Sequence, residues 1–173
     1  MGDFKMGNNT VLTQSGTAKP TFGSGVPTGM IIQVTHGSVT GDVYSATTSW
    51  TSSPLKAASN ITFTPKFATS NILLIANFQA YTAATYGYYD FYKNASDVTE
   101  TYNLSGLLFG LTMIDVTTRW EGKMMTFLDP VAENSTTEKT YSISARGHTA
   151  SNTYIGYSAA NSNQLITIME IAG

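Results

Sequence analysis

The segment that most constrains this chain is Asn163 to Gly173 (NQLITIMEIAG), in which both faces of an extended strand carry apolar side chains. Alternation places Leu165 and Met169 on one face and Ile166 and Ile168 on the other. An antiparallel strand with one face in water normally alternates apolar and polar residues. The segment therefore predicts a strand that lies against the domain core on one side and against another subunit on the other.

A second strand signal, residues 71 to 81 (NILLIANFQAY), has the same character. The face with Ile72, Leu74 and Phe78 is apolar throughout, and the opposite face begins apolar at Leu73 and Ile75. Together the two segments predict an obligate oligomer. The candidate interface residues are Leu73, Ile75, Ile166 and Ile168.

The remaining pattern from residue 29 to 173 is one of short strands separated by turn residues, with no helix-length amphipathic segment and no internal repeat. It predicts an all-β domain of about ten antiparallel strands in two packed sheets, one at a subunit interface and one in water. Residues 119 to 128 (RWEGKMMTFL) are assigned to the water-facing sheet, with Trp120, Met124 and Leu128 pointing inward. Further strands are expected at 30–35, 42–50, 60–64, 86–94, 139–146 and 153–158.

Residues 1 to 28 are rich in Gly, Pro, Ser, Thr and Asn and carry few apolar side chains. Two interpretations remain open: a flexible leader, or an extended arm that becomes ordered on another protein. In the second case the candidate anchoring residues are Phe4, Met6, Val11, Leu12 and Phe22.

Composition excludes several classes of protein. Charged residues make up only 12% of the chain, the net charge is −2 and no basic run occurs, which argues against a nucleic-acid groove and against an anionic membrane surface. The chain has no cysteine, so disulfides and thiolate sites are excluded. The longest apolar run, residues 104 to 114, is too short for a membrane span and is interpreted as buried sheet. No signal-peptide pattern occurs, which argues against secretion by the general route.

No catalytic or metal-binding motif is present. His36 and His148 each stand beside Gly in a turn-like context, without the spacing of a metal site. Glu170 is the one unusual acid, because it falls in a predicted buried strand; a basic partner, protonation or a position at the strand's wet end are the alternatives, with the wet end favoured. We expect a protein that is not an enzyme and that uses neither cofactor nor metal.

Five tyrosines lie between Tyr81 and Tyr92. Tyr86, Tyr88 and Tyr89 form a candidate ligand-binding surface, because tyrosine offers a large stacking area with a polar tip. The alternative, which we favour, is that sheets are simply enriched in aromatic residues.

The segments TFTPKFATSNILLIANF at 62–78 and NSNQLITIMEIAG at 161–173 resemble the C1q/TNF-like jelly-roll head domains of virion structural proteins of tailed phages, particularly those of cyanobacteria and other marine hosts. The resemblance covers residues 29 to 173 and implies a ten-strand jelly roll that forms a tight homotrimer. It also implies a location in the virion, with assembly in the host cytoplasm.

A short arm of about 28 residues without heptads is more typical of a capsid decoration (cement) or head-fibre protein than of a long tail fibre. The first hypothesis is therefore a trimeric phage protein that is anchored to the capsid, or to another virion protein, by its arm. The second is a receptor-binding tip that recognises host surface glycan through the tyrosines. A polysaccharide-degrading enzyme is the third.

Overall fold

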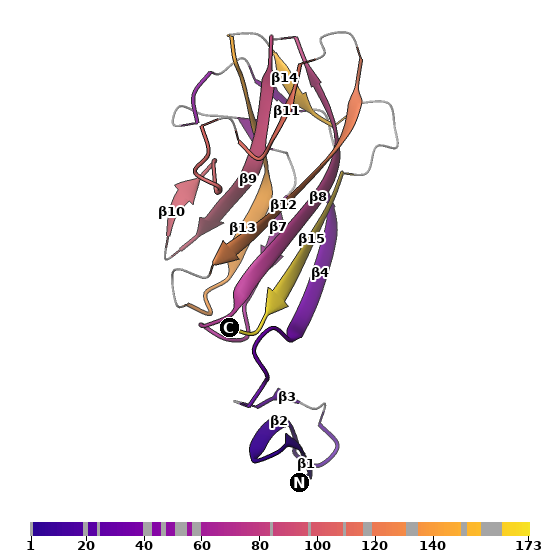
Figure 1. The fold of residues 1–173 in the computed structure, drawn as a ribbon, viewed down its shortest axis with the longest axis vertical. Helices are drawn as coiled ribbons and strands as arrows, with labels where there is room; N and C mark the ends of the chain where they lie inside the picture. Colours follow the sequence, from indigo (N-terminus) through magenta and orange to yellow (C-terminus); the bar gives the residue numbers. More distant parts are fainter. Residues whose placement is uncertain are drawn as a thin grey trace.

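The structure is a computed structural model, which describes residues 2–18, 21–23, 25–39, 43–45, 48–50, 55–56, 60–83, 85–96, 98–108, 110–115, 119–130, 135–149, 152–156 and 164–173. Every regular element in these ranges is a β-strand (Figure 1). Two six-stranded antiparallel sheets face each other and enclose one hydrophobic core, and a small three-stranded sheet lies below them. The predicted all-β, two-sheet antiparallel sandwich is confirmed. Parts of the strands predicted at 42–50 and 153–158 lie outside the described residues.

The first six-stranded sheet, here called the β8 sheet, has four long strands in the order β4, β15, β8 and β12. Beyond the end of β15, the short strand β14 pairs with the same edge of β8, and β5 pairs with β14. The strand bounds are β4 (Ile31–Val39), β5 (Val43–Ser45), β8 (Asn71–Thr82), β12 (Glu121–Pro130), β14 (Thr153–Ile155) and β15 (Gln164–Ile171). The strand with two apolar faces, β15, is therefore central in its sheet, as expected of a segment that is apolar on both sides.

The opposite sheet, here called the β9 sheet, centres on β9 and β13, which pair over nine residues. Two strands extend the β9 edge and two extend the β13 edge. The bounds are β6 (Leu55–Lys56), β7 (Ile61–Phe63), β9 (Gly87–Ala95), β10 (Val98–Thr101), β11 (Thr112–Ile114) and β13 (Lys139–Gly147).

The core lies between the two sheets and comes from every second residue of the long strands. On β8 the buried positions run from Ile72 to Ala80, and across from them β13 contributes Ile143 and Ala145, both without exposed surface. Aromatic rings from the two sheets also meet here, with the ring centroids of Phe78 and Tyr89 5.3 Å apart. This regular alternation of buried and partly exposed residues on β8 follows from the two-residue period of a strand.

Residues 102–108 and 110–111 lie over the outer side of β9. Asp90, which points away from the core, is nevertheless fully buried and accepts hydrogen bonds from the backbone N–H groups of Phe91 (2.7 Å) and Ser105 (3.2 Å) and from the Ser105 hydroxyl. This covering segment explains why β9 is buried on both faces. The prediction that the apolar run 104–114 is buried sheet is wrong for Leu107 and Leu108, which lie 53% and 68% exposed in a loop.

Glu170 joins the last strand to the segment between β7 and β8. Its carboxylate is fully buried and accepts hydrogen bonds from the N–H groups of Lys66 (2.8 Å) and Phe67 (3.0 Å), from the Ser70 hydroxyl (2.7 Å) and from the Gln33 side-chain amide (2.7 Å). The favoured prediction of a wet strand end is therefore wrong: four neutral donors satisfy the carboxylate. The two segments that carry the family resemblance thus meet at this side chain.

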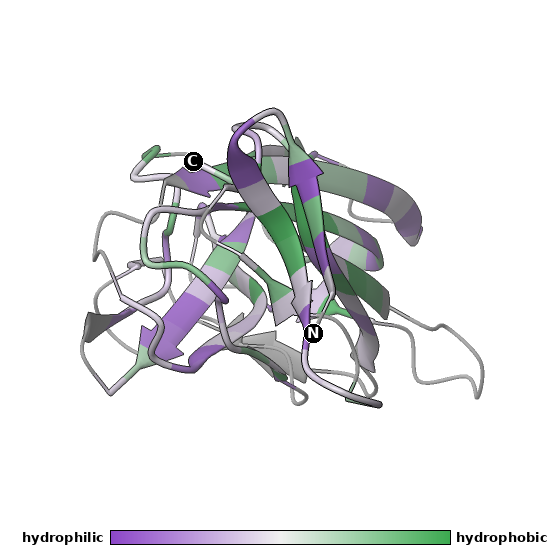
Figure 2. Cartoon of the chain, turned by 90° about the horizontal axis from the view of Figure 1, so that it is seen from below, coloured by the Kyte–Doolittle hydropathy of each residue, from purple (hydrophilic) through white to green (hydrophobic). Residues whose placement is uncertain are grey.

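The N-terminal residues form a three-stranded antiparallel sheet of β1 (Gly2–Met6), β2 (Asn9–Gln14) and β3 (Thr21–Phe22). The chain folds back on itself instead of reaching outward as one extended arm, because a tight turn containing Gly7, with a φ of 62°, links β1 to β2. Figure 2 views the molecule from this end, with the small sheet toward the reader. From Gly29 onward the backbone joins the sandwich, where Met30 and Ala172 share a hydrogen bond.

Candidate functional site

The surface of most interest is the outer face of the β8 sheet, which consists of the side chains that point away from the core on its four long strands. Strand register aligns these side chains in rows. One row, Leu128, Leu73, Met169 and Val34, is apolar across all four strands. The outer face comprises Ile31, Val34, His36, Ser38, Leu73, Ile75, Asn77, Gln79, Gly122, Met124, Thr126, Leu128, Leu165, Thr167, Met169 and Ile171.

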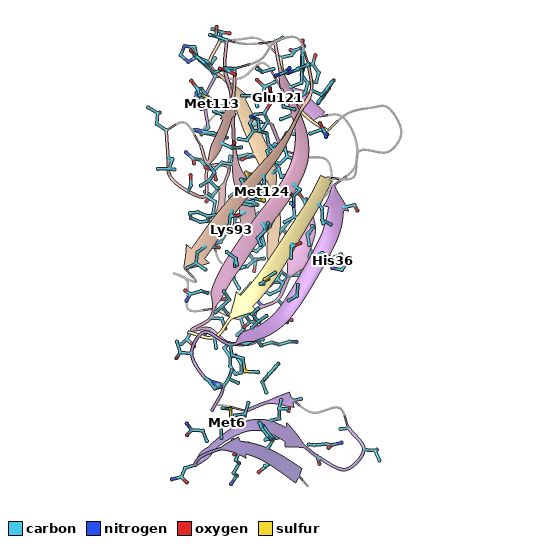
Figure 3. All side chains as sticks on the ribbon, turned by 45° about the vertical axis from the view of Figure 1, so that its right-hand side comes forward. Met6, His36, Lys93, Met113, Glu121 and Met124 are labelled. Atoms are coloured by element: carbon cyan, nitrogen blue, oxygen red, sulfur yellow. The ribbon has the colours of Figure 1, made fainter. Side chains whose placement is uncertain are left out.

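None of the residues of the outer face is Asp, Glu, Lys or Arg. Several of its apolar side chains are open to solvent in the single chain, among them Met124 (65% exposed), Val34 (52%) and Leu128 (49%). Met124 and His36, labelled in Figure 3, lie on β12 and β4, the strands at the two sides of this face. A continuous uncharged patch with several exposed apolar side chains is a candidate interaction surface, because soluble monomers rarely leave one in water.

The structure separates the four predicted interface residues into two pairs. Leu73 and Ile75 lie on the outer face, where both are partly exposed. Ile166 and Ile168 do not: both are fully buried in the sandwich core. Their assignment to an intersubunit surface is therefore wrong. Both faces of β15 are apolar, so alternation alone identified two faces without telling which of them points inward.

The orientation predicted for residues 119 to 128 is also reversed. This segment forms β12 of the β8 sheet, and its core-facing side chains are Met125 (3% exposed) and Phe127. Met124 and Leu128 point outward instead. Glu121 and Lys123 at the start of the strand share a face with Met125 and Phe127, and burial of these two apolar side chains turns that face toward the core.

Two of the three candidate ligand-binding tyrosines are not available to a ligand. Tyr89 points into the core, where its hydroxyl donates hydrogen bonds to the carbonyl groups of Tyr81 (3.1 Å) and Tyr154 (3.2 Å). Burial raises the pKa of the Tyr89 phenol well above its usual range. Tyr88, on the other face of β9, is 2% exposed. Only Tyr86 remains partly exposed, so the predicted surface of three tyrosines is wrong.

Tyr88 belongs to a stack of rings around Arg146 that the sequence did not predict. The Arg146 guanidinium lies 4.5 Å from the Tyr88 ring centroid and 5.4 Å from that of Trp50. Its nitrogen atoms donate to the carbonyl groups of Thr48 and Leu108, and burial lowers its pKa. Because these contacts run from β13 to two loops, the stack fixes the end of the sandwich that lies away from the N-terminal sheet.

His148 closes this stack, with its Nδ1 atom 3.1 Å from the Tyr88 hydroxyl and its ring edge-on to Tyr86. It lies in a bend, as expected from its turn-like context, whereas His36 lies in the middle of β4. Within the described part of the chain, no group of three His, Asp or Glu residues gathers as a metal site would require.

The candidate anchoring residues divide by exposure. Phe4 and Met6 on the edge strand β1 are 57% and 53% exposed, whereas Val11 is 2% exposed. Leu12 and Phe22 are partly exposed, and register places Phe4, Leu12 and Phe22 side by side across the three strands. The N-terminal sheet thus carries an apolar row that is open at Phe4.

An ion pair in the core links the two sheets. Lys93 of β9 and Asp129 of β12 lie 2.9 Å apart, and the Tyr141 hydroxyl donates to the same Asp129 oxygen at 3.0 Å. Both charged residues are only 4% exposed. The sequence does not predict this pair, because it does not show which face of β9 or of β12 points toward the core.

No helix in the described ranges is long and apolar enough to cross a membrane. No protein-family model matches the chain, and no curated protein matches it significantly.

Proposed function

We propose that this chain is a structural protein of a tailed-phage virion: a homotrimeric capsid decoration (cement) or head-fibre protein. In this proposal three sandwiches associate through the outer face of the β8 sheet, and the N-terminal sheet anchors the trimer to the capsid or to another virion protein. The observation that carries the proposal is the uncharged outer face, which a monomer would leave in water. The proposal assigns no catalysis, cofactor or metal to the chain.

The strand order supports the resemblance to jelly-roll head domains. The first and last strands of the sandwich, β4 and β15, pair side by side, and β8 and β12 follow in the same sheet. The opposite sheet has the order β7, β13, β9 and β11. These strand neighbours support a jelly-roll arrangement, in which eight strands form two packed sheets.

Methionine oxidation combined with mass measurement tests the trimer. Three chains of 18.6 kDa give about 56 kDa. Met124 lies on the outer face and is 65% exposed in the single chain, whereas Met113 lies on β11 of the other sheet and is 47% exposed. In the intact protein we expect peroxide to oxidise Met113 several times faster than Met124. Equal rates, or a mass of one chain, would refute the interface.

A charge on the same face supplies the matched mutational test. We expect Met124→Lys to shift the protein from trimer to monomer, because an unpaired ammonium would be buried between subunits. Met113→Lys is the control and should leave the mass unchanged. A trimer that tolerates Met124→Lys would place the contact elsewhere.

Co-sedimentation with undecorated capsids tests the anchor. Phe4 and Met6 are exposed, so replacing both with Ser should leave the fold intact. We expect the wild type to bind capsids and the double variant to lose most of this binding while remaining a trimer. Undiminished capsid binding by the double variant would show that the N-terminal sheet does not anchor through these side chains.

The second candidate function is a receptor-binding tip that recognises host surface glycan. The observation that favours it is the ring stack at the end away from the N-terminal sheet, where Trp50 and Tyr86 keep part of their surface exposed. Aromatic rings at the far end of an anchored protein are suited to stacking on sugar rings. Two results together would favour this candidate over decoration. The wild type would bind host cells but not capsids, and Trp50→Ala and Tyr86→Ala would lose the binding to host cells.

A further inference from the structure

The outer face of the β8 sheet contains a single side chain that changes charge between pH 5 and 8 in ordinary proteins, His36. His36 lies near the middle of β4, is exposed, and stands opposite Thr167 of β15. Its neighbours along the face of β4 are Val34 and Ser38. A histidine at this position can therefore add one positive charge per subunit to a surface that otherwise has none.

No described carboxylate of the elements packed against β4 is placed to neutralise that charge. β15 presents Leu165, Thr167 and Met169 on the same face. Its only acid, Glu170, points into the opposite side of the sheet, where its oxygens are bound by four donors. β7, which packs against the inner side of β4, has the sequence ITF and carries no charge.

This inference rests on the proposed self-association through the outer face. We propose that His36 makes that association pH-dependent, so that trimers form when the imidazole is neutral and dissociate when it is protonated. Assembly removes the face from water, and an imidazolium without a counter-charge loses its hydration without compensation.

Burial without a partner lowers the proton affinity of an imidazole in the assembled state relative to the free chain. The stabilisation of the trimer is therefore fully present while the imidazole is neutral and is lost as the pH falls and the imidazole becomes protonated. Each tenfold decrease in the proton affinity of the imidazole on assembly corresponds to a tenfold decrease, per subunit, in the association constant of the protonated form.

The test is sedimentation equilibrium of the full chain at pH 8.0 and pH 5.5, at the same ionic strength and protein concentration. The chain has two histidines, so His148 in the ring stack of the β9 sheet provides the matched control. We expect the dissociation constant of the wild type and of His148→Gln to rise at least tenfold at pH 5.5. His36→Gln should remain associated at both pH values, and His36→Lys should be dissociated already at pH 8.0.

The outcomes separate the two proposals. A wild type that is monomeric at both pH values would overturn the proposed trimer and this inference with it. A wild type that is trimeric at both pH values would overturn only the pH dependence. Equal dissociation of His36→Gln and the wild type at pH 5.5 would also overturn it, because another group would then be responsible.

Discussion

The Glu170 carboxylate offers the sharpest test of how the sandwich is held together. Glu170→Gln keeps the size and shape of the side chain but removes its charge and replaces one acceptor oxygen by a donor. Hydrogen bonds to a charged group contribute about 1.5–3 kcal/mol, against about 1 kcal/mol for neutral ones. The remaining oxygen can still accept from the Lys66 and Phe67 N–H groups and the Ser70 hydroxyl, as Oε1 does now.

The new amide nitrogen would face donors instead of acceptors, because Oε2 receives the Gln33 amide at 2.7 Å and the Lys66 N–H at 2.9 Å. Weakening of the bonds at Oε1 and loss of those at Oε2 together give a cost of about 3 kcal/mol. For a chain of this length that corresponds to a fall in melting temperature of about 6–12 °C. Glu138→Gln is the matched control, because Glu138 is exposed and its replacement should change stability by less than about 0.5 kcal/mol.

Two measurements check this at one fixed protein concentration, since association would shift the apparent stability. Denaturant unfolding gives the loss of free energy, and amide hydrogen exchange should accelerate at Lys66 and Phe67 in the Glu170→Gln variant but not in the control. A loss below about 1 kcal/mol together with unchanged exchange at these two amides would refute the reasoning.

Three further substitutions have expected outcomes that equilibrium unfolding can check. Lys93→Met should cost about 3–5 kcal/mol, because it leaves Asp129 buried without its ammonium partner. Gly110→Ala should destabilise the covering segment, because Gly110 has a φ of 67° and an added Cβ would collide with the Tyr89 carbonyl oxygen; unchanged stability would contradict this. Burial raises the pKa of the Asp90 carboxyl, so its contribution favours folding at low pH and is lost as the pH rises through the folded-state pKa. Asp90→Asn should therefore reduce the loss of stability as the pH rises above the usual titration range of an Asp carboxyl, and an unaltered profile would show that Asp90 is ionised in the fold without penalty.

The sequence alone was sufficient to predict the class of fold and the two strands, β8 and β15, that carry apolar side chains on both faces. Ile72, Leu74 and Phe78 alternate with polar or partly exposed neighbours over a full strand, so the core face of β8 was predictable from period alone.

The facing of β12 and β15 was not predictable, because each has apolar residues at both odd and even positions. Burial of Ile166 and Met125 depends on which residues of the β9 sheet lie across the core, and one strand contains no information about that. The partners of the Glu170 carboxylate could not be inferred for a similar reason: two of its donors are backbone N–H groups, which every sequence has.

The aromatic segment failed as a site because of what covers it. Tyr88 and Asp90 point away from the core, and among the described residues, 102–108 and 110–111 cover Asp90. That segment has no regular pattern, so the sequence did not indicate that it would fold over β9. The aromatic residues on the outer side of β9 thus indicate packing against a covering segment and not binding of a ligand.

The central position of β15 has a consequence for how the molecule is made. β4 and β8 do not pair with each other; each pairs with β15, and Gln33 meets Glu170 across 137 positions of sequence. On a ribosome, the β8 sheet must therefore wait as two separate pieces until residues 164–171 have emerged, while the local contacts of the N-terminal sheet can form at once. During that interval the apolar surface that β15 covers is exposed to neighbouring nascent chains, so slower synthesis between β8 and β15 should lower the yield of soluble protein.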